Sequence, residues 1–97
     1  MAKAYWISCY RGIADAGKVA AYAKLGAPAI ESGGGRFLAR AAAAQAYEAG
    51  QMERTVIIEF ESVEQAIAVY QSPQYQAALK ELEGGAIRDI RIVPGLD

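Results

Sequence analysis

Residues 54–82, RTVIIEFESVEQAIAVYQSPQYQAALKEL, decide the fold of this chain. Their pattern predicts a strand, a helix, a sharp break and a second helical piece. Ser62 and Gln65 have the S-x-x-Q spacing of a capping box, which marks the start of the first helix. Ser72 and Pro73 form the break, because proline suits the first position of a new helix and serine suits its N-cap. The stretch therefore predicts a β-α unit whose helix is divided in two.

The first third of the chain predicts another strand and another helix. YWISCYR at residues 5–11 is rich in β-favouring residues and carries large side chains on both faces, and Gly12 ends it. Asp15 is the expected N-cap of a helix that Pro28 should kink or restart. SGGG at residues 32–35 ends that helix, since glycine allows the left-handed geometry of a helix C-terminus. Because a phosphate-binding loop opens a helix, SGGG is not expected to hold phosphate.

Two more strands complete the pattern, RFLARA at residues 36–41 and RDIRIV at residues 88–93. Propensity alone favours a helix for the alanine-rich residues 41–50, but their place between two strands favours a long hairpin connection, which we expect. The order is strand, helix, strand, strand, helix, strand. It predicts a single ferredoxin-like α+β domain over residues 1–97, with an antiparallel four-stranded sheet and helices on one face.

Composition excludes several classes of function. The net charge of −1 gives no electrostatic footprint for nucleic acid, and no apolar run is long enough to span a membrane. The absence of histidine excludes Ser-His-Asp and Cys-His catalysis and most transition-metal sites. The one cysteine, Cys9, can form no internal disulfide. We therefore expect a cytoplasmic protein with no metal, no cofactor and no nucleic-acid or membrane partner.

The sheet face without helices should be covered by another surface. It is expected to carry Trp6, Tyr10, Ile57 or Leu38, depending on register, and such a face is too apolar to leave exposed as a patch. Trp6 and Tyr10 would then pack at an interface. The simplest arrangement is a symmetric homodimer with two sheets packed face to face.

Four segments also carry a resemblance to a known family: GGRFLAR at residues 34–40, ERTVIIEFES at 53–62, YQSPQYQAALK at 70–80 and RDIRIVPG at 88–95. They resemble the small bacterial family known as domain of unknown function 1330, over nearly the whole chain. The resemblance implies a dimeric α/β barrel of the ferredoxin-like class and leaves the activity open. The chain departs from the family in having Ala41 and Ala42 after Arg40, where glycines are common, and Leu82 about where an arginine is common.

A cleft beside the uncovered sheet face is the expected site. The polar residues that could point into it are Ser8, Tyr10, Arg40, Glu59, Asp89 and Arg91. In the functional interpretation Arg40 or Arg91 holds an anionic, carboxylate or enolate-like substrate. Glu59 or Asp89 then acts as a base, and Tyr10 is a further catalytic candidate. In the alternative interpretation these charges form solvated ion pairs at the sheet rim or the dimer interface.

Tyr70 and Tyr75 flank the helix break and have two interpretations. They form a pair of hydroxyls at the cleft mouth that bind a ligand oxyanion, or they cover the core with amphipathic rings. Arg54 is expected to be a turn residue. The sequence thus predicts a homodimer that binds a small organic molecule. A cofactor-independent enzyme of isomerase or oxygenase type, by analogy of fold, and a structural or interaction module remain as alternatives.

Overall fold

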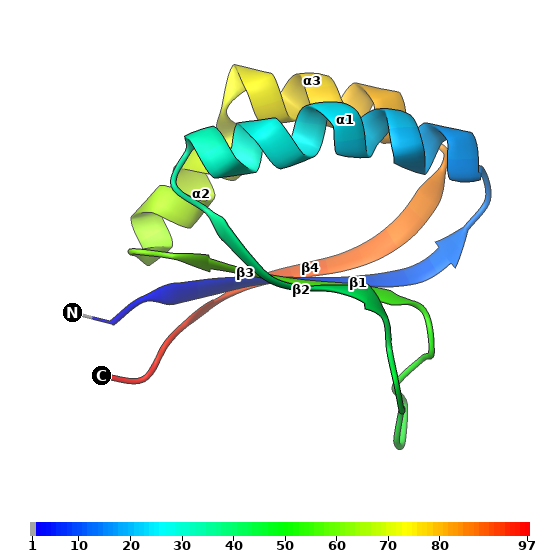
Figure 1. Ribbon diagram of the computed structural model, residues 1–97, viewed down its shortest axis with the longest axis horizontal. Helices are drawn as coiled ribbons and strands as arrows, with labels where there is room; N and C mark the ends of the chain where they lie inside the picture. Colours follow the sequence, from blue (N-terminus) through cyan, green and yellow to red (C-terminus); the bar gives the residue numbers. More distant parts are fainter. Residues whose placement is uncertain (1) are drawn as a thin grey trace.

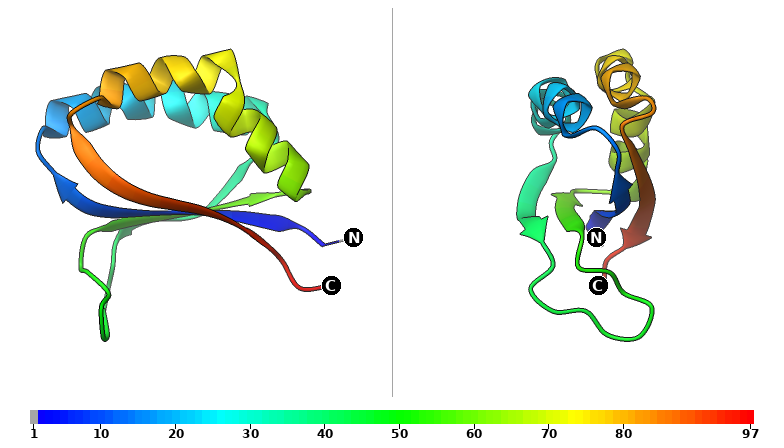
Figure 2. Two further views of the ribbon diagram at one scale, coloured as in Figure 1. Left: turned by 180° about the vertical axis from the view of Figure 1, so that it is seen from behind. Right: turned by 90° about the vertical axis from the view of Figure 1, so that its right-hand side faces the viewer.

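One antiparallel sheet with helices on one face makes up residues 2–97, the part of the chain that the computed structural model describes. The sheet order is β2-β3-β1-β4, and α1 and α3 lie side by side above it (Figures 1 and 2). The elements are β1 (Ala4–Ile13), α1 (Ala16–Ser32), β2 (Arg36–Ala42), β3 (Arg54–Phe60), α2 (Val63–Gln71), α3 (Pro73–Leu82) and β4 (Ala86–Pro94). This is the predicted ferredoxin-like α+β fold. The domain expected over residues 1–97 includes Met1, which lies outside the described residues.

The break between α2 and α3 is confirmed, and serine caps produce it. The Ser62 hydroxyl accepts a hydrogen bond from the Gln65 backbone N–H at 3.1 Å, at the start of α2. The Gln65 side chain reaches back to the N–H of Glu61, one residue before the position that a capping box requires. Ser72 ends α2 and also caps α3, where its hydroxyl accepts from the N–H of Tyr75 at 3.2 Å.

Helix α1 continues through Pro28, so the helix does not restart there. Proline removes one helical hydrogen bond, at a penalty of about 3 kcal/mol. The next two residues, Ala29 and Ile30, are buried, however, and Ile30 packs in the core beneath the helices. This packing holds the last turn in place until the three glycines end the helix. Of these, Gly34 has the left-handed backbone, with φ 97°, that the sequence predicts for this turn.

Strand β1 is longer than predicted, because Gly12 lies within it. The register of β1 against β4 shifts between Tyr10 and Gly12, so the strand absorbs the irregularity and continues to Ile13. The hairpin between β2 and β3 is confirmed, since the two strands pair and residues 43–53 form neither helix nor strand. This loop projects away from the helices (Figures 1 and 2). None of the helices within residues 2–97 is long and apolar enough to span a bilayer.

The two faces of β1 are the reverse of those predicted. Trp6 is 1% exposed and Tyr10 4%, both beneath the helices and away from the uncovered face. The Trp6 ring lies 5.1 Å from that of Tyr75 and 6.0 Å from that of Phe60, centroid to centroid. The largest apolar ring therefore fills the core, where it is removed from water on all sides. Ile57, in register between buried neighbours, does face the uncovered side, as expected.

Candidate functional site

A cavity of about 180 Å³ lies between α1 and the helix-covered face of the sheet, and we call it the α1 cavity. All four strands contribute to its floor or rim, and one side of α1 forms its roof. The volume is close to that of an apolar cavity of about 150 Å³ that holds one benzene ring. The α1 cavity therefore has room for a small molecule with a single ring.

Strand register sets the order of side chains on the cavity floor. Ser8 on β1 and Arg40 on β2 both pair with Val56 on β3, from its two sides. Two residues further along β1, Tyr10 pairs with Arg88 on β4. In the other direction the floor is apolar, with Trp6, Ile58 and Phe37 in one row across three strands. The α1 cavity therefore has one apolar end and one cationic end.

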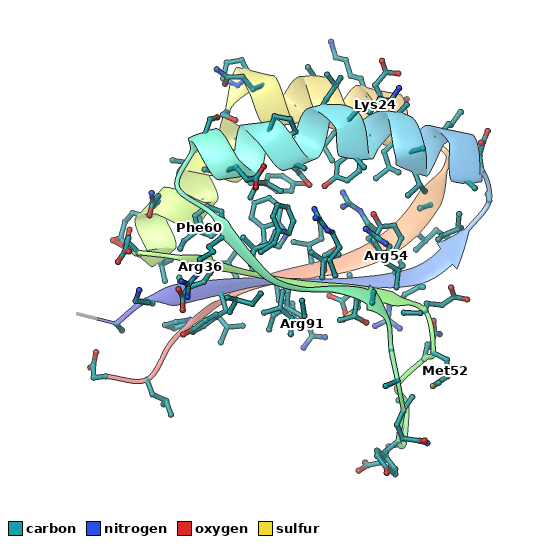
Figure 3. All side chains as sticks on the ribbon, viewed as in Figure 1. Lys24, Arg36, Met52, Arg54, Phe60 and Arg91 are labelled. Carbon is teal, nitrogen blue, oxygen red and sulfur yellow. The ribbon has the colours of Figure 1, made fainter. Side chains whose placement is uncertain are left out.

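Three arginines give the cavity its charge. Arg54 begins β3 and extends into the space between the sheet and α1 (Figure 3). The guanidinium of Arg40 lies 4.3 Å from the centre of the Phe37 ring. Neither these two arginines nor Arg88 forms an ion pair within residues 2–97, and no carboxylate lines the cavity. Three uncompensated positive charges around an apolar space favour an anion.

Arg88 is fixed by two tyrosine hydroxyls. It donates to the Tyr22 hydroxyl at 3.1 Å and, at a longer 3.5 Å, to that of Tyr75. The two hydroxyl oxygens are 2.7 Å apart. Burial raises the pKa of Tyr75 well above its ordinary value, so its hydroxyl stays neutral. Burial acts to lower the pKa of Arg88, but the tyrosine oxygens outweigh it and raise that pKa, so Arg88 keeps its charge.

Tyr70 and Tyr75 do not form the expected pair of hydroxyls at a cleft mouth. Tyr75 is fully buried, and its hydroxyl partner is Tyr22 on α1. The rings of Tyr70 and Tyr75 pack 5.2 Å apart, in line with the core-covering interpretation. Tyr70 lines a shallow hollow on the other side of Arg88, between α3 and β4.

The charged residues predicted for one cleft lie on two faces of the sheet. Arg40 lines the α1 cavity, whereas Glu59, Asp89 and Arg91 lie on the uncovered face. In Figure 3, Arg91 lies on the opposite side of the sheet from Arg54. A register shift between Phe37 and Ala39 turns Arg40 toward the helices. This bulge cannot be read from alternation alone, and it separates Arg40 from Glu59.

The carboxylates of the uncovered face already have partners. Glu59 accepts from Arg36 at 3.0 Å and from the Tyr5 hydroxyl at 3.2 Å. Asp89 accepts from Arg91 at 3.1 Å and from Arg11 at 2.9 Å. These hydrogen bonds from Arg91 and Arg11 lower the pKa of Asp89, so its carboxylate stays ionised. The pairs match the interpretation of these charges as rim ion pairs.

A second, more open hollow of about 580 Å³ lies between the β2–β3 loop and the uncovered face. Cys9 and Arg91 line it together with Asp89, but its charges are the paired ones just described. Within residues 2–97 no group of three cysteine, aspartate or glutamate side chains is arranged to hold a metal ion. The α1 cavity is therefore the stronger candidate site.

Three polar residues of the α1 cavity were missed from the sequence: Tyr22, Arg54 and Arg88. Arg54 was expected in a turn, but it lies on β3 at an alternate position with Val56 and Ile58, so its side chain shares their face of the strand. Val56 and Ile58 are buried beneath the helices. That alternation is the signal that could have found it. Tyr22 and Arg88 come from distant parts of the chain, and no local pattern joins them.

The comparisons with known proteins agree with this fold. The structure resembles that of a protein of unknown function from Rhodopseudomonas palustris at 16% identity and a TM-score of 0.78, over 99% of this chain and 84% of that one. A dimeric protein of unknown function with a ferredoxin-like fold from Bacteroides fragilis matches at 13% identity and a TM-score of 0.56, over 95% of both chains.

A third similar structure carries a functional name. It is called "Putative antibiotic biosynthesis monooxygenase" and comes from Nitrosomonas europaea, with 14% identity and a TM-score of 0.62, over 98% of this chain and 90% of that one. At such identities these similarities show the fold alone. No curated protein matches the chain. A family model described as "Domain of unknown function (DUF1330)" matches residues 3–96.

Proposed function

The chain belongs to the DUF1330 family, and we propose that it binds a small, single-ring organic anion in the α1 cavity. The observation that carries the proposal is the set of three arginines, Arg40, Arg54 and Arg88, around a cavity with no lining carboxylate. Guanidinium groups suit a carboxylate because their donors match its two oxygens. The rings of Trp6 and Phe37 supply an apolar surface for the rest of the molecule.

Native mass spectrometry and ligand titration test this proposal. The purified protein is expected to retain a small anionic molecule. Benzoate, the probe for titration by NMR, is expected to shift signals of residues around the α1 cavity. Benzamide, which has the same ring without the charge, should bind about tenfold more weakly or worse, since a hydrogen bond to a charged group contributes about 1.5–3 kcal/mol.

Arginine variants locate the site. Arg54→Ala and Arg40→Ala should each weaken benzoate binding by about tenfold or more. Arg91→Ala is the matched control, because Arg91 lies on the uncovered face. Equal binding of benzoate and benzamide would sink the proposal. A larger loss with Arg91→Ala than with Arg54→Ala would instead move the site to the hollow that contains Cys9 and Asp89.

We also propose that the protein is a homodimer with the uncovered sheet faces packed together. Ile7, Ile57 and Val93 lie on that face beside its paired charges, and burial of these apolar side chains favours association. The β2–β3 loop projects on the same side (Figure 1), and its residue Tyr47 is 78% exposed. The dimeric Bacteroides fragilis protein is consistent with this assembly. Sedimentation tests it, and a stable monomer at micromolar concentration would refute it.

A cofactor-independent enzyme of isomerase or oxygenase type is the second candidate, supported by the name of the Nitrosomonas europaea protein. In this version the α1 cavity holds an anionic substrate. Glu59 and Asp89, the bases expected from the sequence, lie on the other face of the sheet from Arg40, so they do not reach a molecule in that cavity. Chemical conversion of the retained molecule on incubation would favour the enzyme, and unchanged recovery would favour a binding protein. A cavity that retains nothing would favour the structural or interaction module.

The location in the cell also belongs to the proposal. We propose a cytoplasmic protein, because Cys9, the single cysteine of the sequence, is free and partly exposed, which suits a reducing compartment. Fractionation of the source cells, followed by detection of the protein, tests this location. Recovery outside the cytoplasm would refute it.

A further inference from the structure

Ser8 is a buried polar residue whose hydroxyl has no partner in the protein. Its Oγ is the one buried side-chain nitrogen or oxygen within residues 2–97 that makes no hydrogen bond. The residue is 3% exposed and lines the α1 cavity. Buried hydroxyls are nearly always hydrogen-bonded, and each exception calls for a reason. The described part of the chain supplies no partner for this hydroxyl.

The position of Ser8 on the cavity floor indicates what kind of partner would suit it. Trp6, Ser8 and Tyr10 follow one another on the same face of β1. Trp6 belongs to the apolar row of the floor, and Tyr10 pairs with Arg88 at the cationic end. Alternate residues of a strand are about 7 Å apart along it, so Ser8 lies about that far from each end. Arg40 lies in the same row as Ser8, across Val56, so a ring near Trp6 whose anionic group meets Arg40 lies beside Ser8.

We infer that the ligand of the α1 cavity is an organic anion with a second hydrogen-bonding group, a hydroxyl or a carbonyl, and that Ser8 binds this group. The inference rests on the proposed function, because it needs an anion at the arginines. A serine hydroxyl can donate to a carbonyl or accept from a hydroxyl, so both kinds of group fit. Ser8 thereby selects among anions that the arginines alone would hold equally well.

Titration with benzoate and with the ortho, meta and para isomers of hydroxybenzoate tests the inference. At least one isomer is expected to bind the wild-type protein about five- to tenfold more tightly than benzoate, the ratio that one net hydrogen bond gives. In Ser8→Ala this preference, the ratio of the two affinities, should fall to about twofold or less. The wild-type comparison needs no variant, so it stands even if Ser8→Ala disturbs the fold.

Ser32→Ala is the matched control, because the Ser32 hydroxyl donates to the Ala29 carbonyl at the end of α1. It should keep the full preference. If benzoate binds and no hydroxybenzoate isomer binds better, the inference is wrong and the proposed function stands. A preference that survives in Ser8→Ala also overturns the inference. If neither benzoate nor any isomer binds, the proposed function and this inference fail together.

Discussion

Replacing Tyr75 with phenylalanine should destabilise the protein moderately and change its stability at high pH. Tyr75→Phe keeps the buried ring and removes one hydroxyl, which lies 2.7 Å from the Tyr22 oxygen and a long 3.5 Å from Arg88. The variant therefore loses one good hydrogen bond, and the free energy of unfolding should fall by about 1 kcal/mol. For a domain of this size that corresponds to a decrease of about 4–8 °C in Tm.

Tyr22→Phe is the matched comparison and should destabilise the protein more than Tyr75→Phe does. It removes the same bond to Tyr75 and also the one that Arg88 donates at 3.1 Å. Because that second bond involves a charged donor, the loss should reach about 2–3 kcal/mol. Urea unfolding of both variants measures the difference. If Tyr75→Phe proves as damaging as Tyr22→Phe, the assignment of the stronger bond to Tyr22 is wrong.

The free energy of unfolding should decrease as pH rises above 10. The pKa of Tyr75 is raised by burial above its ordinary value of 10.0, so above that pH the unfolded chain releases a proton that the folded chain keeps. The stabilisation is complete below pH 10 and is lost as pH rises further, with a slope of up to about 1.4 kcal/mol per pH unit. Tyr75→Phe lacks this contribution, so its stability should fall less steeply above pH 10 than that of the wild type. Parallel curves would refute the argument.

Three further predictions concern the N-cap of α3, the turn at Gly34 and the ion pair between Asp89 and Arg91. Ser72→Ala should lower the free energy of unfolding by about 0.5–2 kcal/mol in urea, since it removes the N-cap of α3, whereas Ser72→Asp should restore most of the loss. Gly34→Ala should cost at least about 1 kcal/mol, because φ is 97° and the added Cβ would meet the Gln65 side chain; a neutral effect would mean that the turn relaxes freely. Arg91→Gln should raise the pKa of Asp89 toward 3.8 in an NMR titration, and the wild-type stability that comes with the lowered pKa should be lost as pH falls below that value. An unchanged titration would show that Arg11 alone holds the carboxylate.

The helices, their caps and the order of helices and strands along the chain follow from local sequence. The Ser72 cap is a hydrogen bond between residues three apart, and the alternation of β3 places each side chain relative to its immediate neighbours. Both features depend only on nearby residues, so the sequence alone predicts them. Pro28 is the exception among the helices, because burial of Ile30 outweighs a local penalty. A local rule fails there since the compensating energy comes from contacts with distant parts of the chain.

Residues 54–82 by themselves determined a β-α unit with a divided helix, and together with the strands and the helix predicted around them they determined the fold class. The location of the candidate site was decided only by the tertiary structure. A strand that is apolar on both faces does not show which face the helices cover, and packing against Phe60 and Tyr75 holds Trp6 beneath them. The bulge in β2 then turns Arg40 to the same side, and β4 brings Arg88 to Tyr22. The α1 cavity forms because the fold brings these residues of β1, β2 and β4 together beneath α1. No single segment of the sequence contains them all.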